Sequence, residues 1–96
     1  MRFLIRAKTP TEAGNKMVQD PDFMKKLEDY MNKAKPEAAY FLPMDGLRTS
    51  VFIVNIESSD QVPAFGEPLF QWMGANVDVT PVMNYDDLKK GLSERR

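Results

Sequence analysis

The chain of 96 residues contains no cysteine and no histidine. The lack of cysteine excludes disulfides, a thiol nucleophile and a thiolate metal site. The lack of histidine removes the usual general base near neutral pH and the commonest metal ligand. These two absences restrict the possible functions more than any other feature of the composition, and we expect neither a metal nor a cofactor.

The chain also lacks an excess of charge of either sign and lacks a long apolar run. Thirteen basic residues stand against fourteen acidic ones, a net charge of -1, which leaves no electrostatic footprint for nucleic acid or an anionic membrane. No apolar run approaches the ~20 residues that a membrane span needs. The start, MRFLIRAK, has no apolar centre and no cleavage site of a signal peptide. We expect a cytoplasmic protein that binds neither nucleic acid nor membranes.

The apolar content is that of an ordinary globular protein. Hydrophobic residues make up 43% of the chain and aromatic residues 10%, enough for a packed core. The length suits one domain. We expect a single domain over residues 1–92, followed by a frayed tail over residues 93–96.

Hydrophobic periodicity predicts the order strand, helix, strand, strand, helix, strand, with a short terminal helix. The expected strands are residues 2–8, 37–44, 48–56 and 76–83. Asp45–Gly46 is a turn signal that joins the second and third strands in a hairpin. Pro81 lacks an N–H group, so it places the fourth strand at an edge of the sheet.

The helices have recognisable start and stop signals. The first helical region is expected to begin with Thr9 as N-cap and to break at Pro21, where a longer helix runs to about residue 35. The second region, residues 58–74, is expected to bend or restart near its internal glycine and proline, Gly66 and Pro68. The terminal helix is expected to begin at an Asn84 cap and to end at Gly91.

Crossover connections between parallel strands are right-handed in ~98% of cases, which places both main helical regions on the same side of the sheet. The predicted fold class is therefore α+β. We expect a ferredoxin-like βαββαβ sandwich with a four-stranded antiparallel sheet, helices on one face, and a short C-terminal helix.

The third strand does not alternate, since every side chain from Val51 to Val54 is apolar. The sheet face away from the helices would therefore be apolar as well. It is expected to carry Leu4, Val82, half of the third strand (Phe52 and Val54, or Val51 and Ile53) and half of the second (Tyr40 and Leu42, or Ala39 and Phe41).

A bare apolar patch of several hundred Å² exceeds what monomers normally expose. We expect a second copy to pack sheet to sheet as a two-fold homodimer. The alternative is that residues 85–96 fold under the sheet of their own chain.

Several polar side chains are expected on the same face. One register sets Leu4 opposite Thr80 and Arg6 opposite Asp78. An arginine between two sheets must be paired or must bind an anion. In one interpretation Arg6, with Tyr40, Arg48 or Thr80, holds the polar end of a small carboxylate or phenolate. In the other, an Arg6–Asp78 ion pair closes the mouth of the interface.

The single tryptophan, Trp72, lies on the expected second helical region near its end. Its spacing with Val62, Phe65, Leu69 and Met73 is that of a buried helix face. A tryptophan in this position usually packs in the core, and the alternative is that it lines a ligand pocket.

The first strand, MRFLIRAK, and the last strand with its acidic-capped helix, VDVTPVMNYDDLKKGL, resemble the dimeric α+β barrel superfamily. The resemblance is to its small uncharacterised single-domain members and spans about 90 residues. It implies two ferredoxin-like sheets around a shared interior. The superfamily includes cofactor-independent monooxygenases and muconolactone isomerase-like enzymes. Its enzymes often use histidine, which this chain lacks.

Three functions follow as hypotheses. The first is a homodimeric protein that binds a small apolar or aromatic anionic ligand, between helices and sheet or between two sheets. The second is a cofactor-independent monooxygenase or isomerase that uses Arg6, Tyr40 and Asp78, with Asp78 as a base if it is buried. The third is a protein-interaction module that is a monomer in isolation.

Overall fold

The structure, a computed structural model, describes residues 1–95 of the chain. Its strands form one antiparallel sheet of order β2-β3-β1-β4. The strands are β1 (Arg2–Thr9), β2 (Ala38–Met44), β3 (Leu47–Asn55) and β4 (Asn76–Pro81). The helices are α1 (Thr11–Gln19), α2 (Phe23–Ala34), α3 (Val62–Met73) with the 3₁₀ turn η1 (Ser59–Gln61) before it, and α4 (Tyr85–Ser93).

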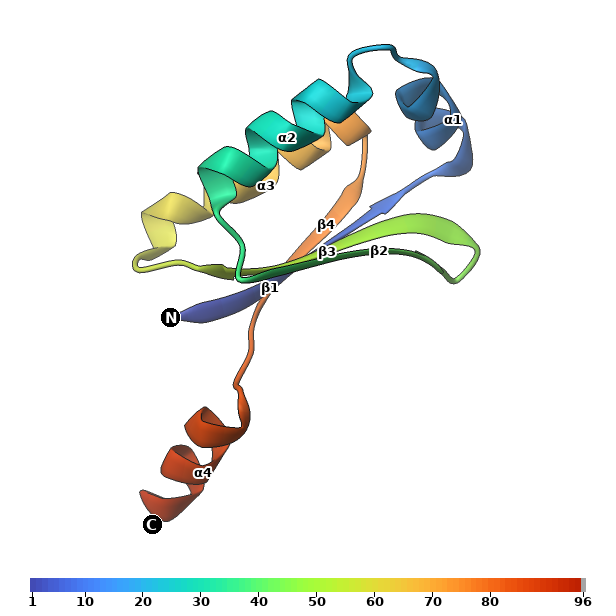
Figure 1. The fold of residues 1–96 in the computed structure, drawn as a ribbon. Helices are drawn as coiled ribbons and strands as arrows, with labels where there is room; N and C mark the ends of the chain where they lie inside the picture. Colours follow the sequence, from blue (N-terminus) through green and yellow to red (C-terminus); the bar gives the residue numbers. More distant parts are fainter. Residues whose placement is uncertain (96) are drawn as a thin grey trace.

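Figure 1 shows α1, α2 and α3 on one face of the sheet, and α4 on the other side, at the end of an extended linker. The core lies between the three helices and the sheet. Its largest fully buried side chains are Phe52, Ile5, Ile56, Leu69, Met73 and Val54. Each such side chain stabilises the fold by roughly 1.5–3 kcal/mol. The α+β class with four antiparallel strands is confirmed, and it is compatible with a ferredoxin-like fold.

The first helical region breaks where the sequence predicts it. Between α1 and α2 the Asp20 carboxylate accepts hydrogen bonds from the Asp22 backbone N–H (2.9 Å) and the Lys26 ammonium (2.7 Å). The Lys26 hydrogen bond is the main reason that the pKa of Asp20 is lowered. The expected N-cap role of Thr9 is wrong, because Thr9 pairs with Arg48 as the last residue of β1 and is buried.

The expected restart in the second helical region is also wrong, and the expected bend stays a prediction. Residues 62–73 form one continuous helix that contains Gly66 and Pro68. Pro68 removes only the hydrogen bond to the Ala64 carbonyl. The buried side chains Leu69 and Met73 lie on the sheet-facing side of this helix, and their packing holds the helix together across the missing bond.

The predicted hairpin turn is confirmed. Asp45 and Gly46 both have positive φ (54° and 75°), as a two-residue hairpin turn requires. The Lys8 ammonium binds the Asp45 carboxylate and lowers its pKa. β4 is an edge strand, as Pro81 predicts.

The last helix starts as predicted and ends later than predicted. The Asn84 side chain accepts from the Asp87 N–H (2.8 Å), and the Asp87 carboxylate accepts from the Asn84 N–H (3.0 Å). The end expected at Gly91 is wrong, since the helix continues to Ser93. Of the expected tail 93–96, Ser93 is therefore helical, and Arg96 lies outside the described residues.

Candidate functional site

The sheet has an open face, which we define as the face opposite α1, α2 and α3. In the ladders Arg6 pairs with Val51 on one side and Asp78 on the other. Leu4 likewise pairs with Ile53 and Thr80, so the expected Leu4–Thr80 and Arg6–Asp78 register is confirmed. Opposed residues in an antiparallel pair point to the same face. The apolar side chains on the open face therefore include Leu4, Val51, Ile53, Tyr40 and Leu42.

The other half of the non-alternating strand faces the helices. Phe52 and Val54 are 0% and 1% exposed, and Ala39 pairs with Phe52.

The side chains on the open face differ widely in their exposure to solvent. Tyr40, on the edge strand β2, is 62% exposed, whereas Thr49 near the hairpin is only 3% exposed. The exposed apolar surface of the sheet is therefore concentrated toward β2.

Arg6 and Asp78 form an ion pair in the open face. The Arg6 Nη2 and Nε atoms donate to the same Asp78 Oδ2 oxygen, at 2.7 and 3.2 Å. Both side chains remain accessible, at 39% and 57% exposure. The sequence left two roles open for Arg6, an ion pair with Asp78 or a contact with a ligand. The ion pair is present. It uses two of the five N–H donors of the guanidinium, so the remaining donors can bind a second anion.

Thr80 lies next to this ion pair on β4, and Tyr40 lies on the same face two strands away from Arg6. Thr80 follows Asp78 by two residues on β4, so their side chains share a face. Tyr40 pairs with Val51, which in turn pairs with Arg6. Four of the six predicted site residues are therefore brought together in the open face.

Arg48 is not part of this group. It pairs with Thr9, on the helix side of the sheet, and its Nη1 donates to the Asn15 side chain at 3.0 Å. Arg48 lies across Gly14 of α1, where an added Cβ would come within 2.7 Å of Nη1. The glycine therefore leaves the space that the guanidinium occupies, and Arg48 fixes α1 against the sheet.

Trp72 is also remote from the open face. It packs against Phe23 of α2 at a ring distance of 5.8 Å and contacts the core. It also lines a groove of about 560 Å³ between α2 and α3. The indole N–H is buried without a hydrogen-bond partner among residues 1–95. Trp72 thus packs against the core as expected, and a role in ligand binding stays a prediction.

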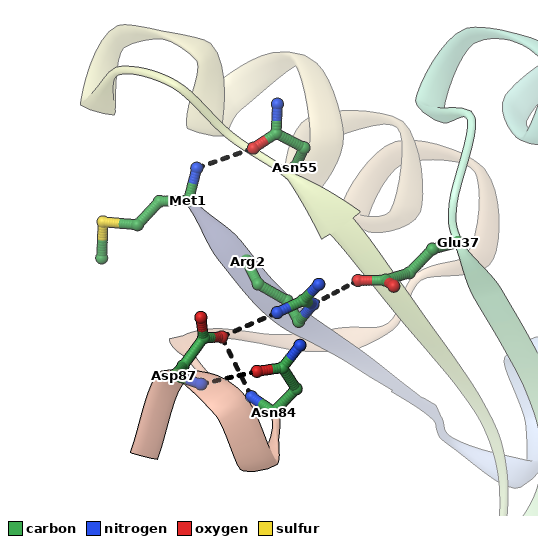
Figure 2. A network of polar contacts seen from close by, with 6 residues as sticks. All are labelled: Met1, Arg2, Glu37, Asn55, Asn84 and Asp87. Carbon is green, nitrogen blue, oxygen red and sulfur yellow. Dashed lines mark hydrogen bonds and ion pairs between the residues drawn. The ribbon is translucent and has the colours of Figure 1, made fainter. Parts of the chain in front are cut away.

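A polar network that the sequence did not predict joins α4 to the sheet. Figure 2 shows the Arg2 guanidinium between the Glu37 and Asp87 carboxylates, with an Nη1–Oδ2 distance of 2.7 Å to Asp87. The N-terminal ammonium of Met1 donates to the Asn55 side chain at 2.6 Å. The Glu37 hydrogen bond is the main reason that the pKa of Arg2 is raised, and the Asp87 charge adds to it. Alternation on the first strand predicts that Arg2 lies on the same face of the sheet as Arg6. No other feature of the sequence indicates this network.

The position of α4 decides whether the chain covers its own open face. Figure 1 shows α4 projecting away from the sheet rather than lying under it. All residues of α4 are described and none is buried. The alternative in which residues 85–96 fold under their own sheet is therefore wrong for residues 85–95.

Within residues 1–95 the side chains form no group of three potential metal ligands. No helix in this range has the length and apolarity to cross a membrane. No protein-family model matches the chain, and no curated protein matches it either.

Proposed function

We propose that the protein is a ferredoxin-like homodimer of the dimeric α+β barrel type that binds a small apolar or aromatic anion between its two sheets. The observation that carries the proposal is the open face, where the partly exposed apolar side chains Leu4, Val51 and Ile53 lie on the same side of the sheet as the accessible Arg6–Asp78 pair. α4 leaves this face uncovered.

Apolar burial drives the association. Fully burying a large apolar side chain contributes roughly 1.5–3 kcal/mol. Tyr40 and Leu42 are 62% and 37% exposed, and two-fold packing would bury both of them from each copy. Leu4, Val51 and Ile53, which are partly exposed, add further apolar area.

The ligand chemistry follows from the same face. The space between helices and sheet is filled by core side chains such as Ile5, Phe52 and Leu69, all 0% exposed, so the space between two sheets is the better ligand site. Apolar walls select an apolar or aromatic body, and the spare N–H groups of Arg6 select a carboxylate or phenolate. Thr80 supplies a hydroxyl group on the neighbouring strand, and Tyr40 supplies another on the same face beyond β3.

The enzymatic alternative has less support. A base role for Asp78 requires burial, whereas its side chain is 57% exposed and paired with Arg6. The geometry therefore favours binding over proton abstraction.

Multi-angle light scattering tests the assembly. We expect the wild-type chain to have the mass of a dimer and Tyr40→Glu that of a monomer, because the glutamate places a charge in the interface. Phe70→Glu is the matched control, since Phe70 is 46% exposed on α3 and should leave the dimer intact. A monomeric wild-type chain at tens of micromolar would refute the proposed assembly.

A thermal-shift titration with 1-naphthoate tests the ligand site. We expect the melting temperature to rise with ligand, and the rise to be lost in Arg6→Gln. Arg48→Gln is the matched control, because this arginine lies on the helix side of the sheet with Asn15. An equal rise in wild type and Arg6→Gln would exclude Arg6 from the site.

A further inference from the structure

Two clusters of large apolar side chains lie exposed on different parts of the chain. The first, which we call the α4 stripe, consists of Tyr85, Leu88 and Leu92, at 75%, 43% and 48% exposure. The second, the β2 patch, consists of Tyr40 and Leu42, at 62% and 37% exposure, on the open face of β2. Together they make up five of the eleven large exposed hydrophobic side chains among residues 1–95.

The α4 stripe is directed away from its own domain by the polar network at the start of the helix. Successive residues of a helix are separated by about 100° around its axis, so Tyr85, Leu88 and Leu92 lie between about 100° and 160° from Asp87. Asp87 is held by Arg2 at 2.7 Å. Because this ion pair turns the Asp87 side toward the sheet, the stripe is turned outward.

The cap fixes this orientation. Asn84 and Asp87 exchange two hydrogen bonds at the first turn (Figure 2), so the helix begins at a defined residue and leaves the sheet in a defined direction. An amphipathic helix held in place with its apolar side outward is suited to a partner outside its own chain.

The β2 patch lacks a covering element, just as the α4 stripe lacks a surface to pack on. β2 is an edge strand, and edge strands with apolar side chains are normally covered by a helix or loop. Within the described chain α1, α2 and α3 lie on one face of the sheet and α4 projects away from the other. The patch therefore also needs a cover from outside the chain.

We propose that the α4 stripe of each subunit packs on the β2 patch of a second copy, so that the two subunits exchange C-terminal arms. This inference rests on the proposed homodimer and adds the identity of the contact. The contact is self-complementary, since each copy gives one stripe and receives one, as two-fold symmetry requires. The nine residues of α4 span about 14 Å. Packed sheets lie about 10 Å apart, so α4 reaches the level of the partner's sheet.

Cysteine cross-linking tests the contact directly, because the chain has no native cysteine. Leu88→Cys and Leu42→Cys are made as two separate full-length variants, mixed, and treated with a short bifunctional maleimide. We expect a cross-linked species that contains one chain of each variant. Met24→Cys is the matched control for Leu42→Cys. It is 66% exposed on α2, and it should give no cross-link to Leu88→Cys.

A charge substitution gives an independent measurement. Leu88→Lys should raise the dimer dissociation constant about a hundredfold, because two buried leucines are lost per dimer. Val18→Lys, at an exposed apolar position of α1 (46%), should leave it unchanged. Circular dichroism establishes that both variants fold.

The outcomes separate this inference from the homodimer itself. A dimeric mass without the Leu42–Leu88 cross-link, together with unchanged dissociation of Leu88→Lys, overturns the arm exchange and leaves the sheet-to-sheet dimer standing. A cross-link within one chain, found in the double variant as a linked monomer, also overturns the exchange. A monomeric wild-type chain overturns both proposals.

Discussion

Tyr30 is the core residue whose polar atom matters most to the fold. It is 6% exposed, and its hydroxyl donates to the Phe65 carbonyl at 2.8 Å, so it connects α2 to α3. We expect Tyr30→Phe to lower the free energy of unfolding by about 1–2 kcal/mol, since the substitution leaves a carbonyl without this donor. Urea denaturation measures the change. Val18→Ala, at an exposed position of α1, is the control and should be nearly neutral.

The same hydroxyl predicts a loss of stability at alkaline pH. Burial raises the pKa of Tyr30 well above its ordinary value, whereas in the unfolded chain a tyrosine ionises near pH 10. Above about pH 10 the unfolded state therefore binds fewer protons than the folded state, and the free energy of unfolding falls as pH rises.

Absorbance at 295 nm during an alkaline titration tests this expectation. The phenolate of Tyr30 should appear only together with unfolding, and that step should be missing in Tyr30→Phe. An absorbance step that is present in the wild type, missing in Tyr30→Phe and complete before any loss of ellipticity would contradict the assignment.

The candidate site shows how far residue-level prediction reaches. Alternation along β1 and β4 fixed the faces of Arg6 and Asp78, and the structure pairs them as expected. The run Val51–Val54 is apolar on both faces, so it leaves the face of every residue of β3 undetermined. A shift of one residue exchanges the two faces of a strand. The sequence could therefore not show on which face of the sheet Arg48 lies. In the structure Arg48 lies on the face opposite to that of Arg6.

Among the elements, α4 depends most on a few polar contacts, because none of its residues is buried. Asp87→Ala removes both the carboxylate that accepts from the Asn84 N–H and the ion pair with Arg2. We expect faster amide hydrogen exchange across residues 85–93, with a local loss of about 1–2 kcal/mol. Exchange measured by mass spectrometry is the readout.

Asp86→Ala is the matched control for this prediction. Both aspartates lie in the first turn of α4, so both substitutions remove the same charge near the helix N-terminus. Only Asp87 contacts Asn84 and Arg2 in the described structure. Equal acceleration of exchange in the two variants would mean that charge near the helix end, rather than these contacts, holds α4.

At the element level, local signals predicted starts and turns better than ends and continuity. The Asn84 cap and the Asp45–Gly46 turn are local hydrogen-bonding and φ requirements, which the sequence states directly. The continuity of α3 through Pro68 depends on packing against the sheet, which overrides local propensity. The Arg2–Asp87 pair joins residues 85 positions apart, and no local sequence pattern predicts a contact over that separation.

The whole chain is longer than a compact domain of its size. Its Cα radius of gyration is 15.0 Å, with extents of 52 × 27 × 19 Å, against the about 12–13 Å expected for 96 residues. Figure 1 shows the cause, since α4 extends beyond the sheet. An elongated chain with an outward apolar helix and an apolar sheet face supports the assembly that we propose.

Thermal stability should therefore depend on protein concentration. Unfolding of a dimer to two chains is opposed by association, so each tenfold rise in concentration adds about 1.4 kcal/mol per dimer. For an assembly of this size we expect the melting temperature to rise by about 2–4 °C per tenfold, measured by scanning calorimetry between micromolar and millimolar concentrations. Tyr40→Glu, with its charge in the open face, should melt at one temperature throughout. A wild-type melting temperature that is equally independent of concentration would mean that the open face stays in water.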